Sequence, residues 1–333
     1  MYNRVLIFRT DKIGDLLAAC PAILTIKKNI KNSEITLISS DINHNYAKNL
    51  EIFDHVYQFP KVGLTNKIKF IYQLSKKKFD YIFIYDTKDR SIISSIFIKS
   101  KYKFAIIHKN KFSIFCKLFK IKYHSANKNI TWNSIYQESL NYINIGKNIE
   151  NYDFLKIKKN NNFSSNVPIK NYIHIHLDEK WINNLYIDSY KSINPGLDEF
   201  IEFINILGNN YNILITTGIK DFSLINDLKN KYFKKKTENI YYNKVSSNFI
   251  YFIYKPTFYD LESLLRNSKI LISCHGAITH AANSFDVQII DIIEEKRESS
   301  YKLFSSHLKN YNLVYRNEFN IIKEYLINKI NEN

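Results

Sequence analysis

The chain has 333 residues, 45% of them hydrophobic, which is enough for two domains that each have a core. Its formal net charge of +17 suits an anionic partner, either nucleic acid, a membrane surface or an acidic substrate, although the Lys-, Ile- and Asn-rich composition accounts for part of the excess. No apolar run reaches the ~18 residues of a membrane-spanning helix, and the first residues lack a signal-peptide pattern. Three scattered cysteines, Cys20, Cys116 and Cys274, fit neither a disulfide framework nor a zinc site. We therefore expect a cytoplasmic protein without a membrane anchor.

The first half alternates short apolar runs with amphipathic segments. Expected strands are 5–8, 34–39, 55–59, 81–85 and 104–107, and expected helices start at 15 and cover 47–53, 67–77, 91–98 and 132–142. In the segment 67–77, Ile68, Ile71, Tyr72 and Leu74 form an apolar stripe at helical spacing. Strands and helices that alternate at this pitch predict a doubly wound parallel sheet.

The polar, aperiodic stretch 156–170 is the best linker, because the same alternation starts again after it. Expected strands in the second half are 172–177, 211–216, 248–254, 269–273 and 287–293, and expected helices are 197–207, 222–232, 261–267 and 318–330. The sequence thus predicts an N-terminal domain of residues 1–155 and a C-terminal domain of residues 171–333. The last helix is free to pack back on the N-terminal domain.

The most informative stretch is Arg9-Thr-Asp-Lys-Ile-Gly-Asp15, which joins the first strand to the first helix. In a βαβ unit, ligands bind beyond the carboxyl ends of the strands, so these residues are candidates for a site. Gly14 suits a tight turn with a positive φ. Asp15 at the helix start is favoured by free N–H groups, and by pattern alone a helix cap is the more common role for it.

Together with Pro21-Ala-Ile, this stretch resembles the signature that opens the ADP-heptose:lipopolysaccharide heptosyltransferases, glycosyltransferase family nine. The resemblance implies the GT-B fold, in which two Rossmann-like domains face each other across a cleft. It also implies that Asp15 is the catalytic base. Composition and spacing alone do not assign that role.

A second motif is the strand–turn–helix stretch 269–283, which contains Cys274-His-Gly-Ala277 and His280. It resembles the family's Asp-Ser/Thr-Gly-x-x-His-x-Ala element, which holds the diphosphate of the donor. N–H groups at a helix start and a small glycine suit a phosphate. However, Cys274-His275 replaces the usual acid, and one extra residue separates Gly276 from His280. A packed helix histidine is the plain alternative for His280.

Two weaker candidates lie in the second half. Asp178-Glu-Lys-Trp181 resembles the Lys-x-Trp or Lys-Trp segment that opens the family's second domain, so Lys180 is expected to pair with donor phosphate. A solvated lysine is its alternative, and core packing is the commoner role for Trp181. Asp221, which follows Thr217-Gly218, is placed where a carboxylate could bind ribose hydroxyls.

These observations predict an inverting glycosyltransferase that moves a heptose-like sugar from a nucleotide-diphosphate sugar to a lipopolysaccharide or other cell-surface glycan. Asp15 and Lys180 are the catalytic candidates. The donor candidates are His275, Gly276, Ala277, His280 and Asp221, and the acceptor candidates are Arg9, Thr10, Asp11, Lys12 and Gly14. Without an Asp-x-Asp motif we expect no metal, and the only small-molecule requirement is the nucleotide sugar.

The positive charge suits an anionic glycolipid acceptor and peripheral contact with the inner face of an anionic membrane. Two alternatives stay open. One is a GT-B glycosyltransferase with another nucleotide sugar and a non-lipid acceptor, which the Cys274-His275 replacement favours. The other is a non-enzymatic nucleic-acid-binding protein, which only the charge supports, because no nucleic-acid-binding motif is present.

Overall fold

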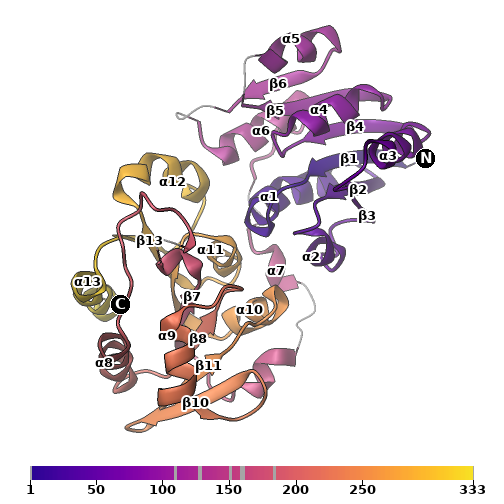
Figure 1. Cartoon of the computed structure of the whole chain (residues 1–333). Helices are drawn as coiled ribbons and strands as arrows, with labels where there is room; N and C mark the ends of the chain where they lie inside the picture. Colours follow the sequence, from indigo (N-terminus) through magenta and orange to yellow (C-terminus); the bar gives the residue numbers. More distant parts are fainter. Residues whose placement is uncertain are drawn as a thin grey trace. The chain divides into compact units, whose positions relative to one another are not determined.

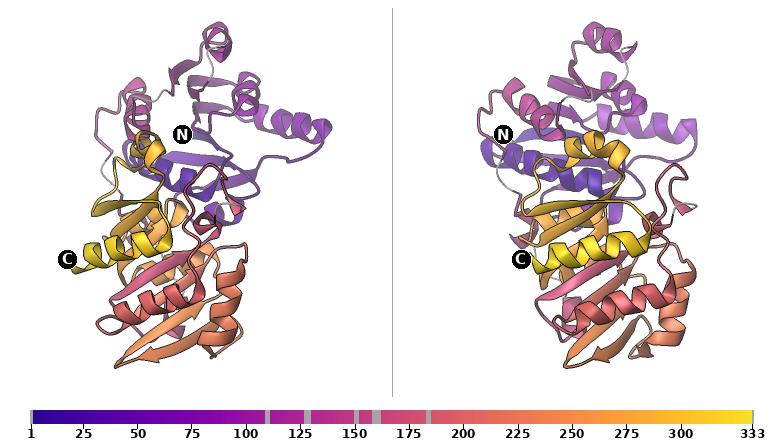
Figure 2. Two further views of the ribbon diagram at one scale, coloured as in Figure 1. Left: turned by 60° about the vertical axis from the view of Figure 1, so that its left-hand side comes forward. Right: turned by 90° about the vertical axis from the view of Figure 1, so that its left-hand side faces the viewer.

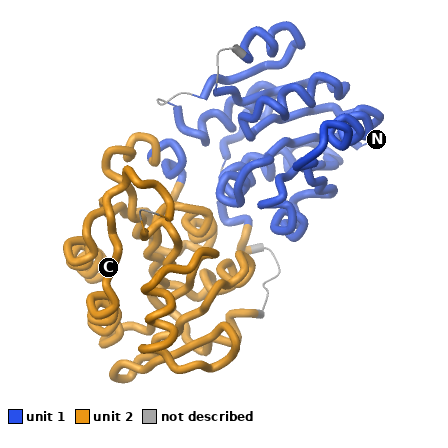
Figure 3. Tube along the Cα trace, in the orientation of Figure 1, with its two compact units in different colours: residues 1–154, 302–307 blue, residues 155–301, 308–333 orange. Residues whose placement is uncertain are grey.

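The computed structural model describes residues 2–108, 111–126, 130–149, 152–157, 162–182 and 185–332. The chain forms two compact units, residues 1–154 with 302–307 and residues 155–301 with 308–333 (Figure 3). The division falls beside the stretch 156–170 that the sequence suggests as a linker. Residues 158–161 of that stretch lie outside the described residues, and Asn162–Asn166 form a 3-10 turn (η1).

The first unit contains a six-stranded sheet in the order β3-β2-β1-β4-β5-β6, in which every pair is parallel (Figure 1). The strands are β1 Asn3–Arg9, β2 Ser33–Ser39, β3 His55–Gln58, β4 Phe79–Ile84, β5 Ser100–Ile107 and β6 Lys122–Ser125. This is a doubly wound order, and its direction reverses between β1 and β4. The carboxyl ends of these two strands are where such a sheet binds ligands.

Helices of the first unit are α1 Ile13–Asn29, α2 His44–Lys48, α3 Leu64–Ser75, α4 Asp89–Ile96, α5 Lys111–Leu118 and α6 Trp132–Tyr142. Side chains of α3, α4 and α5 join one core cluster with alternate residues of the sheet, so these three helices cover the same face. In α3, Leu74 is buried and Phe70 packs against this cluster, whereas Ile68 and Tyr72 are exposed. The helix α5 and the strand β6 were not expected.

The second unit repeats the same strand order and adds an antiparallel edge: β14-β13-β12-β7-β8-β11-β10-β9. Its strands are β7 Tyr172–Leu177, β8 Ile213–Thr217, β9 Lys234–Lys235, β10 Ile240–Val245, β11 Asn248–Ile253, β12 Ser268–Cys274, β13 Gln288–Ile293 and β14 Tyr311–Tyr315. The sheet is therefore mixed and not wholly parallel. A tight turn with Ser246 at positive φ returns the chain from β10 to β11 as a hairpin, and this turn lacks the glycine that usually marks one.

Helices of the second unit are α8 Leu197–Gly208, α9 Ser223–Asp227, α10 Phe258–Leu265, α11 Ala277–Asn283, α12 Glu298–Ser305 and α13 Phe319–Asn331, and the short helix α7 Phe154–Ile157 lies where the units divide. Phe319, Ile322 and Leu326 of α13 are buried in the core of the second unit, and α13 runs beside α8 (Figure 2). Among the described residues, no helix has the length and apolar character needed to cross a bilayer.

Candidate functional site

The turn after β1 is joined to the end of β4 by a buried carboxylate. Asp86 Oδ2 accepts hydrogen bonds from the Thr10 N–H at 3.2 Å, the Thr10 hydroxyl at 2.6 Å and the Ser91 hydroxyl at 2.6 Å. Arg90 in turn donates to the Thr10 hydroxyl at 3.0 Å. Thr10 is buried and its hydroxyl is bonded to Asp86 and Arg90, and its expected role in acceptor binding stays a prediction.

Arg9 organises this turn and does not lie on its surface. Its side chain is 3% exposed. Nε donates to the Asp15 carbonyl at 2.9 Å, and Nη1 donates to the Tyr85 carbonyl. The guanidinium also pairs with Asp11 at 3.1 Å and lies 3.8 Å from the Asp15 carboxylate. The expected role of Arg9 as an acceptor-binding cation is therefore corrected. It fixes the two carboxylates of the turn.

Asp11 has one carboxylate oxygen still available for a ligand. Its Oδ2 pairs with Arg9, whereas Oδ1 is buried and has no hydrogen-bond partner among the described residues. Burial raises the pKa of Asp11 to about 7, although the Arg9 charge acts against that rise. A carboxyl group that titrates near neutral pH is typical of functional sites. The sequence did not single out Asp11 from the other residues of the motif.

Asp15 lies in the first turn of α1, three residues after the extended residue Lys12. Its Oδ2 accepts the Lys12 N–H at 3.2 Å, which is a capping bond, yet the side chain remains 37% exposed. The structure thus shows a cap and leaves the carboxylate accessible. The positive φ expected at Gly14 is wrong, because Gly63 is the glycine with positive φ among the described residues. Gly14 is already within the helix, and the chain turns before it.

In the second unit, the side chain of Lys180 lies across the ends of β7 and β12. Its ammonium pairs with Asp178 Oδ2 at 2.7 Å and donates to the carbonyls of Cys274 at 3.1 Å and His275 at 2.9 Å. Burial works against this charge, but the Asp178 carboxylate outweighs it and the pKa of Lys180 is raised. Lys180 is therefore a fixed cation at the point where the strand order reverses, and not the solvated lysine of the alternative interpretation.

Gly276 is needed because Lys180 occupies the space above it. A Cβ at this position would overlap Lys180 Nζ, which three bonds hold in place. The N–H of Gly276 donates to the Thr279 hydroxyl at 3.2 Å, so this donor is already used. A phosphate-binding role for the Gly276 N–H stays a prediction. The next residue, Ala277, begins α11.

His275 is oriented by a fully buried carboxylate of the neighbouring strand. Asp291 on β13 accepts from His275 Nδ1 at 2.6 Å and from the Tyr311 hydroxyl at 2.8 Å. With Nδ1 engaged, Nε2 is the ring nitrogen left to meet a ligand. The Tyr301 ring lies edge-on to the histidine, with ring centroids 5.1 Å apart. Asp291 was missed, although a single carboxylate inside an apolar strand was a signal that a buried partner exists.

Of the other donor candidates, His280 lies beside His275, whereas Asp221 lies at a different strand end. The ring of His280 on α11 is 5.4 Å from that of His275, so the structure brings the two histidines together. Asp221, in contrast, is bonded to Lys255 at 2.7 Å and to the Tyr254 hydroxyl at 2.9 Å. These partners follow β11, which lies on the far side of β8 from β7. The structure therefore does not join Asp221 to Lys180.

Several plain expectations are confirmed. Trp181 is fully buried, and its indole donates to the His176 carbonyl at 2.9 Å, so it is a core residue. Cys20, Cys116 and Cys274 are free and buried. Burial raises the pKa of Cys274 to about 12, which excludes it as a nucleophile at neutral pH.

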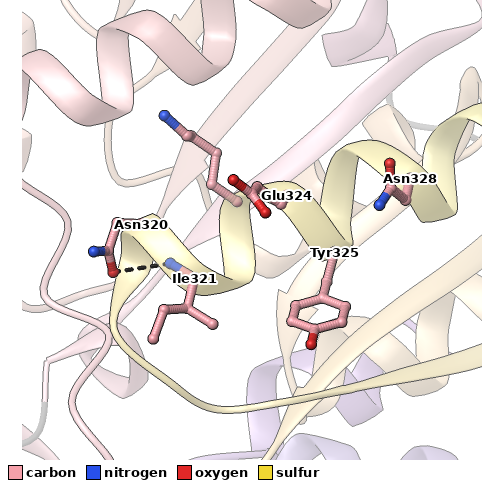
Figure 4. Close-up of a pocket in the computed structure, with 6 residues that line it drawn as sticks. Asn320, Ile321, Glu324, Tyr325 and Asn328 are labelled. Carbon is pink, nitrogen blue, oxygen red and sulfur yellow. Dashed lines mark hydrogen bonds between the residues drawn. The ribbon is translucent and has the colours of Figure 1, made fainter.

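A hollow along α13 is not part of either cluster. It is lined by Asn320, Ile321, Lys323, Glu324, Tyr325 and Asn328, all from one helix (Figure 4). The Asn320 side chain there accepts the N–H of Ile321 at 2.8 Å, a local helix-end bond. No side chains from separate strand ends converge on this hollow, so we do not assign a function to it.

The sequence matches no protein-family model and no curated protein. Solved structures do match it over nearly its whole length. A family nine glycosyltransferase from Veillonella parvula has a TM-score of 0.66 at 14% identity, covering 99% of this chain and 89% of that chain. E. coli heptosyltransferase WaaC, solved with ADP-2-deoxy-2-fluoro heptose, has a TM-score of 0.66 at 13% identity, covering 98% and 99%.

The fold is that of the family nine glycosyltransferases. This confirms the expected GT-B class of two Rossmann-like units. A UDP-GlcNAc 2-epimerase from Methanocaldococcus jannaschii has the same fold at a TM-score of 0.58 and 14% identity, covering 99% of this chain and 92% of that one. The fold alone therefore does not select the reaction.

Proposed function

We propose that the protein is a glycosyltransferase that moves a heptose-like sugar from a nucleotide-diphosphate sugar to an anionic cell-surface glycan such as lipopolysaccharide. One observation carries the proposal. In a fold shared with solved heptosyltransferases, the residues of the sequence motifs lie at the strand ends where each sheet reverses its order, β1 with β4 and β7 with β12.

The reaction proposed is a direct displacement that inverts the anomeric centre and needs no metal. The acceptor oxygen bonds to the anomeric carbon as the bond from that carbon to the diphosphate breaks, and Asp15 takes the proton of the acceptor hydroxyl. Asp15 suits this role because its carboxylate is partly exposed and held by Arg9 and by the Lys12 N–H. Asp11, with its unpartnered oxygen, is the neighbouring carboxylate that could bind a second acceptor hydroxyl.

The leaving nucleoside diphosphate gains negative charge as it departs, and fixed cations are the usual means of stabilising it. Lys180 supplies such a charge, because it is ion-paired and tied to two carbonyls at the end of β12. His275, oriented by Asp291, adds a ring nitrogen of defined direction next to it. We propose that the diphosphate binds at this cluster and that the side chains of Lys180 and His275 stabilise its negative charge.

The proposal is tested by mixing the full chain with ADP-heptose, UDP-GlcNAc, a GDP-sugar and a CMP-sugar, with and without a lipopolysaccharide-core acceptor. We expect release of ADP that depends on the acceptor, and a loss of release in Lys180→Gln. If none of the four nucleotide sugars binds or reacts, the transferase proposal fails, and the nucleic-acid-binding alternative becomes the one to pursue.

The replacement at Cys274-His275 keeps a second candidate in the same class, a transferase that uses another nucleotide sugar and a non-lipid acceptor. Release of UDP, GDP or CMP instead of ADP would select it. Conversion of UDP-GlcNAc without any acceptor would instead indicate an epimerase, the reaction named for the Methanocaldococcus jannaschii protein of this fold.

A further inference from the structure

The outer side of the first unit carries an unusual number of exposed apolar side chains on neighbouring helices. They come from α3, from α4 and its end, and from α5 and its end: Leu64, Ile68, Tyr72, Ile93, Phe97, Ile114, Phe115, Leu118 and Phe119. Leu64 is 74% exposed, Leu118 72% and Ile114 71%. Because α3, α4 and α5 (Figure 1) all cover the same face of the sheet, we assign their exposed apolar side chains to one side of the unit, which we call the basic apolar face.

The apolar residues are placed as in helices that lie on a surface. In α3, Leu64, Ile68 and Tyr72 follow one another at intervals of four residues and therefore form a stripe along one side of the helix. The apolar stripe therefore faces away from the core, and Leu74 is the residue of α3 that is buried. In α5, the exposed apolar residues alternate with the buried Phe112 and Cys116, so this helix is apolar on both sides.

Around the exposed apolar residues of α3 and α5, the charged side chains are all positive. Segments 61–78 and 111–122 contain no Asp or Glu. Lys67, Lys69, Lys76, Lys117 and Lys120 make no ion pair among the described residues. Scattered apolar residues on a surface need no explanation, but a group of them among unpaired lysines is the pattern of interfacial helices that bind anionic lipid.

We propose that the basic apolar face docks the protein on an anionic lipid bilayer, with the apolar side chains of α3 and α5 in the headgroup–acyl boundary and the lysines on lipid phosphates. An anionic bilayer accounts for both the lysines and the apolar side chains of this face, whereas other partners account for only one of the two. A polyanion such as RNA would use the lysines and leave the apolar stripe in water. A second copy would bring two lysine-rich surfaces together. The inference rests on the proposed function only in that a lipid-held acceptor gives the docking a purpose.

The test is sedimentation of the full chain with vesicles of phosphatidylcholine alone or with 30% phosphatidylglycerol, over a range of salt concentrations. We expect binding to the anionic vesicles only, weakening as salt rises. The double variant Ile68→Ser/Leu118→Ser should bind about 10-fold to 100-fold more weakly, since each side chain leaves the apolar boundary. Lys69→Gln/Lys120→Gln should lose roughly fivefold per lysine.

Matched controls come from the second unit. Tyr325→Ser removes an exposed apolar side chain of α13, and Lys234→Gln/Lys235→Gln removes two exposed lysines of β9. Neither should change vesicle binding. All substituted side chains are exposed, so thermal unfolding should stay within a few degrees of the parent.

Three results would overturn the proposal: equal binding to neutral vesicles, equal losses in the controls, or an unchanged Ile68→Ser/Leu118→Ser variant. If only the lysine variant loses binding, and loses RNA binding in parallel, the face is a polyanion surface. Because sedimentation needs neither donor nor acceptor, its outcome is independent of the nucleotide-release assay, and failure of one leaves the other standing.

Discussion

Asp11 and Asp15 lie on the same turn and share Arg9, but their bonding differs. Asp15 has a capping bond and an exposed side chain, while Asp11 has a buried oxygen without a partner. The capping bond shows why the pattern alone favoured a structural role for Asp15. The cap and the catalytic base use the same carboxylate, so only a variant that keeps one and removes the other separates them.

Asp15→Asn is that variant. Asparagine keeps an oxygen that can accept the Lys12 N–H, but it cannot take a proton. We expect turnover to fall by about 10²–10⁴ with nucleotide affinity little changed. The measurement is kcat and KM for nucleotide release, with the melting temperature as a check on the cap. Turnover close to that of the parent would leave Asp15 as a cap and move attention to Asp11.

Asp11 predicts a pH dependence of stability. Its pKa of about 7 in the folded protein is above the ordinary value near 3.8, so between these pH values the folded state holds a proton that the unfolded state has lost. This group therefore lowers stability progressively as the pH rises from about 4 to about 7. In Asp11→Asn that loss is absent, so its stability relative to the parent should be greater at pH 8 than at pH 5 in urea unfolding. A difference that is the same at both pH values contradicts the pKa.

Much of the residue-level site could be predicted, and the exceptions have a common cause. The sequence located the turn 9–15, Lys180 and His275, because each directly follows an apolar strand. It could not show that Arg9 and Thr10 spend their polar groups internally, since the partners Tyr85 and Asp86 are more than 70 residues away along the chain. Long-range pairing of polar groups leaves no local pattern.

At the scale of elements, β7 is the strand with the most unusual interior. Every residue of Tyr172–Leu177 is buried, including His174 and His176, whose rings share the Thr216 hydroxyl at 2.8 and 2.9 Å. One hydroxyl can donate to one ring and accept from the other, so two neutral histidines satisfy it. Burial first, and then the nearby Lys180 charge, lowers the pKa of His176 to about 3.

This strand predicts a loss of stability in acid. Between about pH 6.5 and about pH 3, the unfolded chain takes up a proton at His176 and the folded chain does not, so stability falls as the pH falls through that range. His176→Gln should make the decline less steep, whatever repacking costs it at neutral pH. Equal slopes in the variant and the parent would contradict the prediction.

The turn between β12 and α11 gives a second prediction at this scale. Gly276→Ala adds a Cβ that would lie 2.4 Å from Lys180 Nζ, so the ammonium must shift from the position in which it bonds to the two carbonyls. We expect nucleotide affinity to fall about 10-fold or more, because the fixed cation of the proposed diphosphate site is displaced. Calorimetry with ADP measures it. Gly146→Ala is the control, since a Cβ there meets nothing within 4 Å, and equal affinity in both variants would place the donor elsewhere.

The predicted helices and strands are confirmed where the apolar periodicity and the length of a segment indicated the same type of element. The strand at 172–177 and the helix at 132–142 have the predicted bounds. The prediction went wrong where short polar or aromatic strands formed at an edge, as in β6 and β9. Edge strands are held by a single neighbour, so their own sequence specifies them weakly.

At the scale of the whole molecule, the two units have separate cores and their own switch points. We therefore predict two transitions in calorimetric unfolding, of which ADP raises only the one that belongs to the second unit. A ligand at 100 times its dissociation constant stabilises by about 2.7 kcal/mol. Lys180→Gln should abolish the shift, whereas Lys323→Gln, which removes another ion-paired lysine of that unit, should keep it. A shift of both transitions, or of the first alone, would contradict a donor site confined to the second unit.

The overlap above Gly276 also constrains how this protein can change over evolutionary time. A side chain at position 276 is harmful while a long cation stands at position 180, and it becomes harmless once that cation is gone. The two positions, 96 residues apart in the chain, should therefore vary together. A lysine at position 180 requires glycine at position 276, whereas a short neutral residue at position 180 allows any residue at position 276. If Lys180 were lost, the proposed donor site would lose its cation, and a side chain acquired at position 276 would then hinder the return of the lysine.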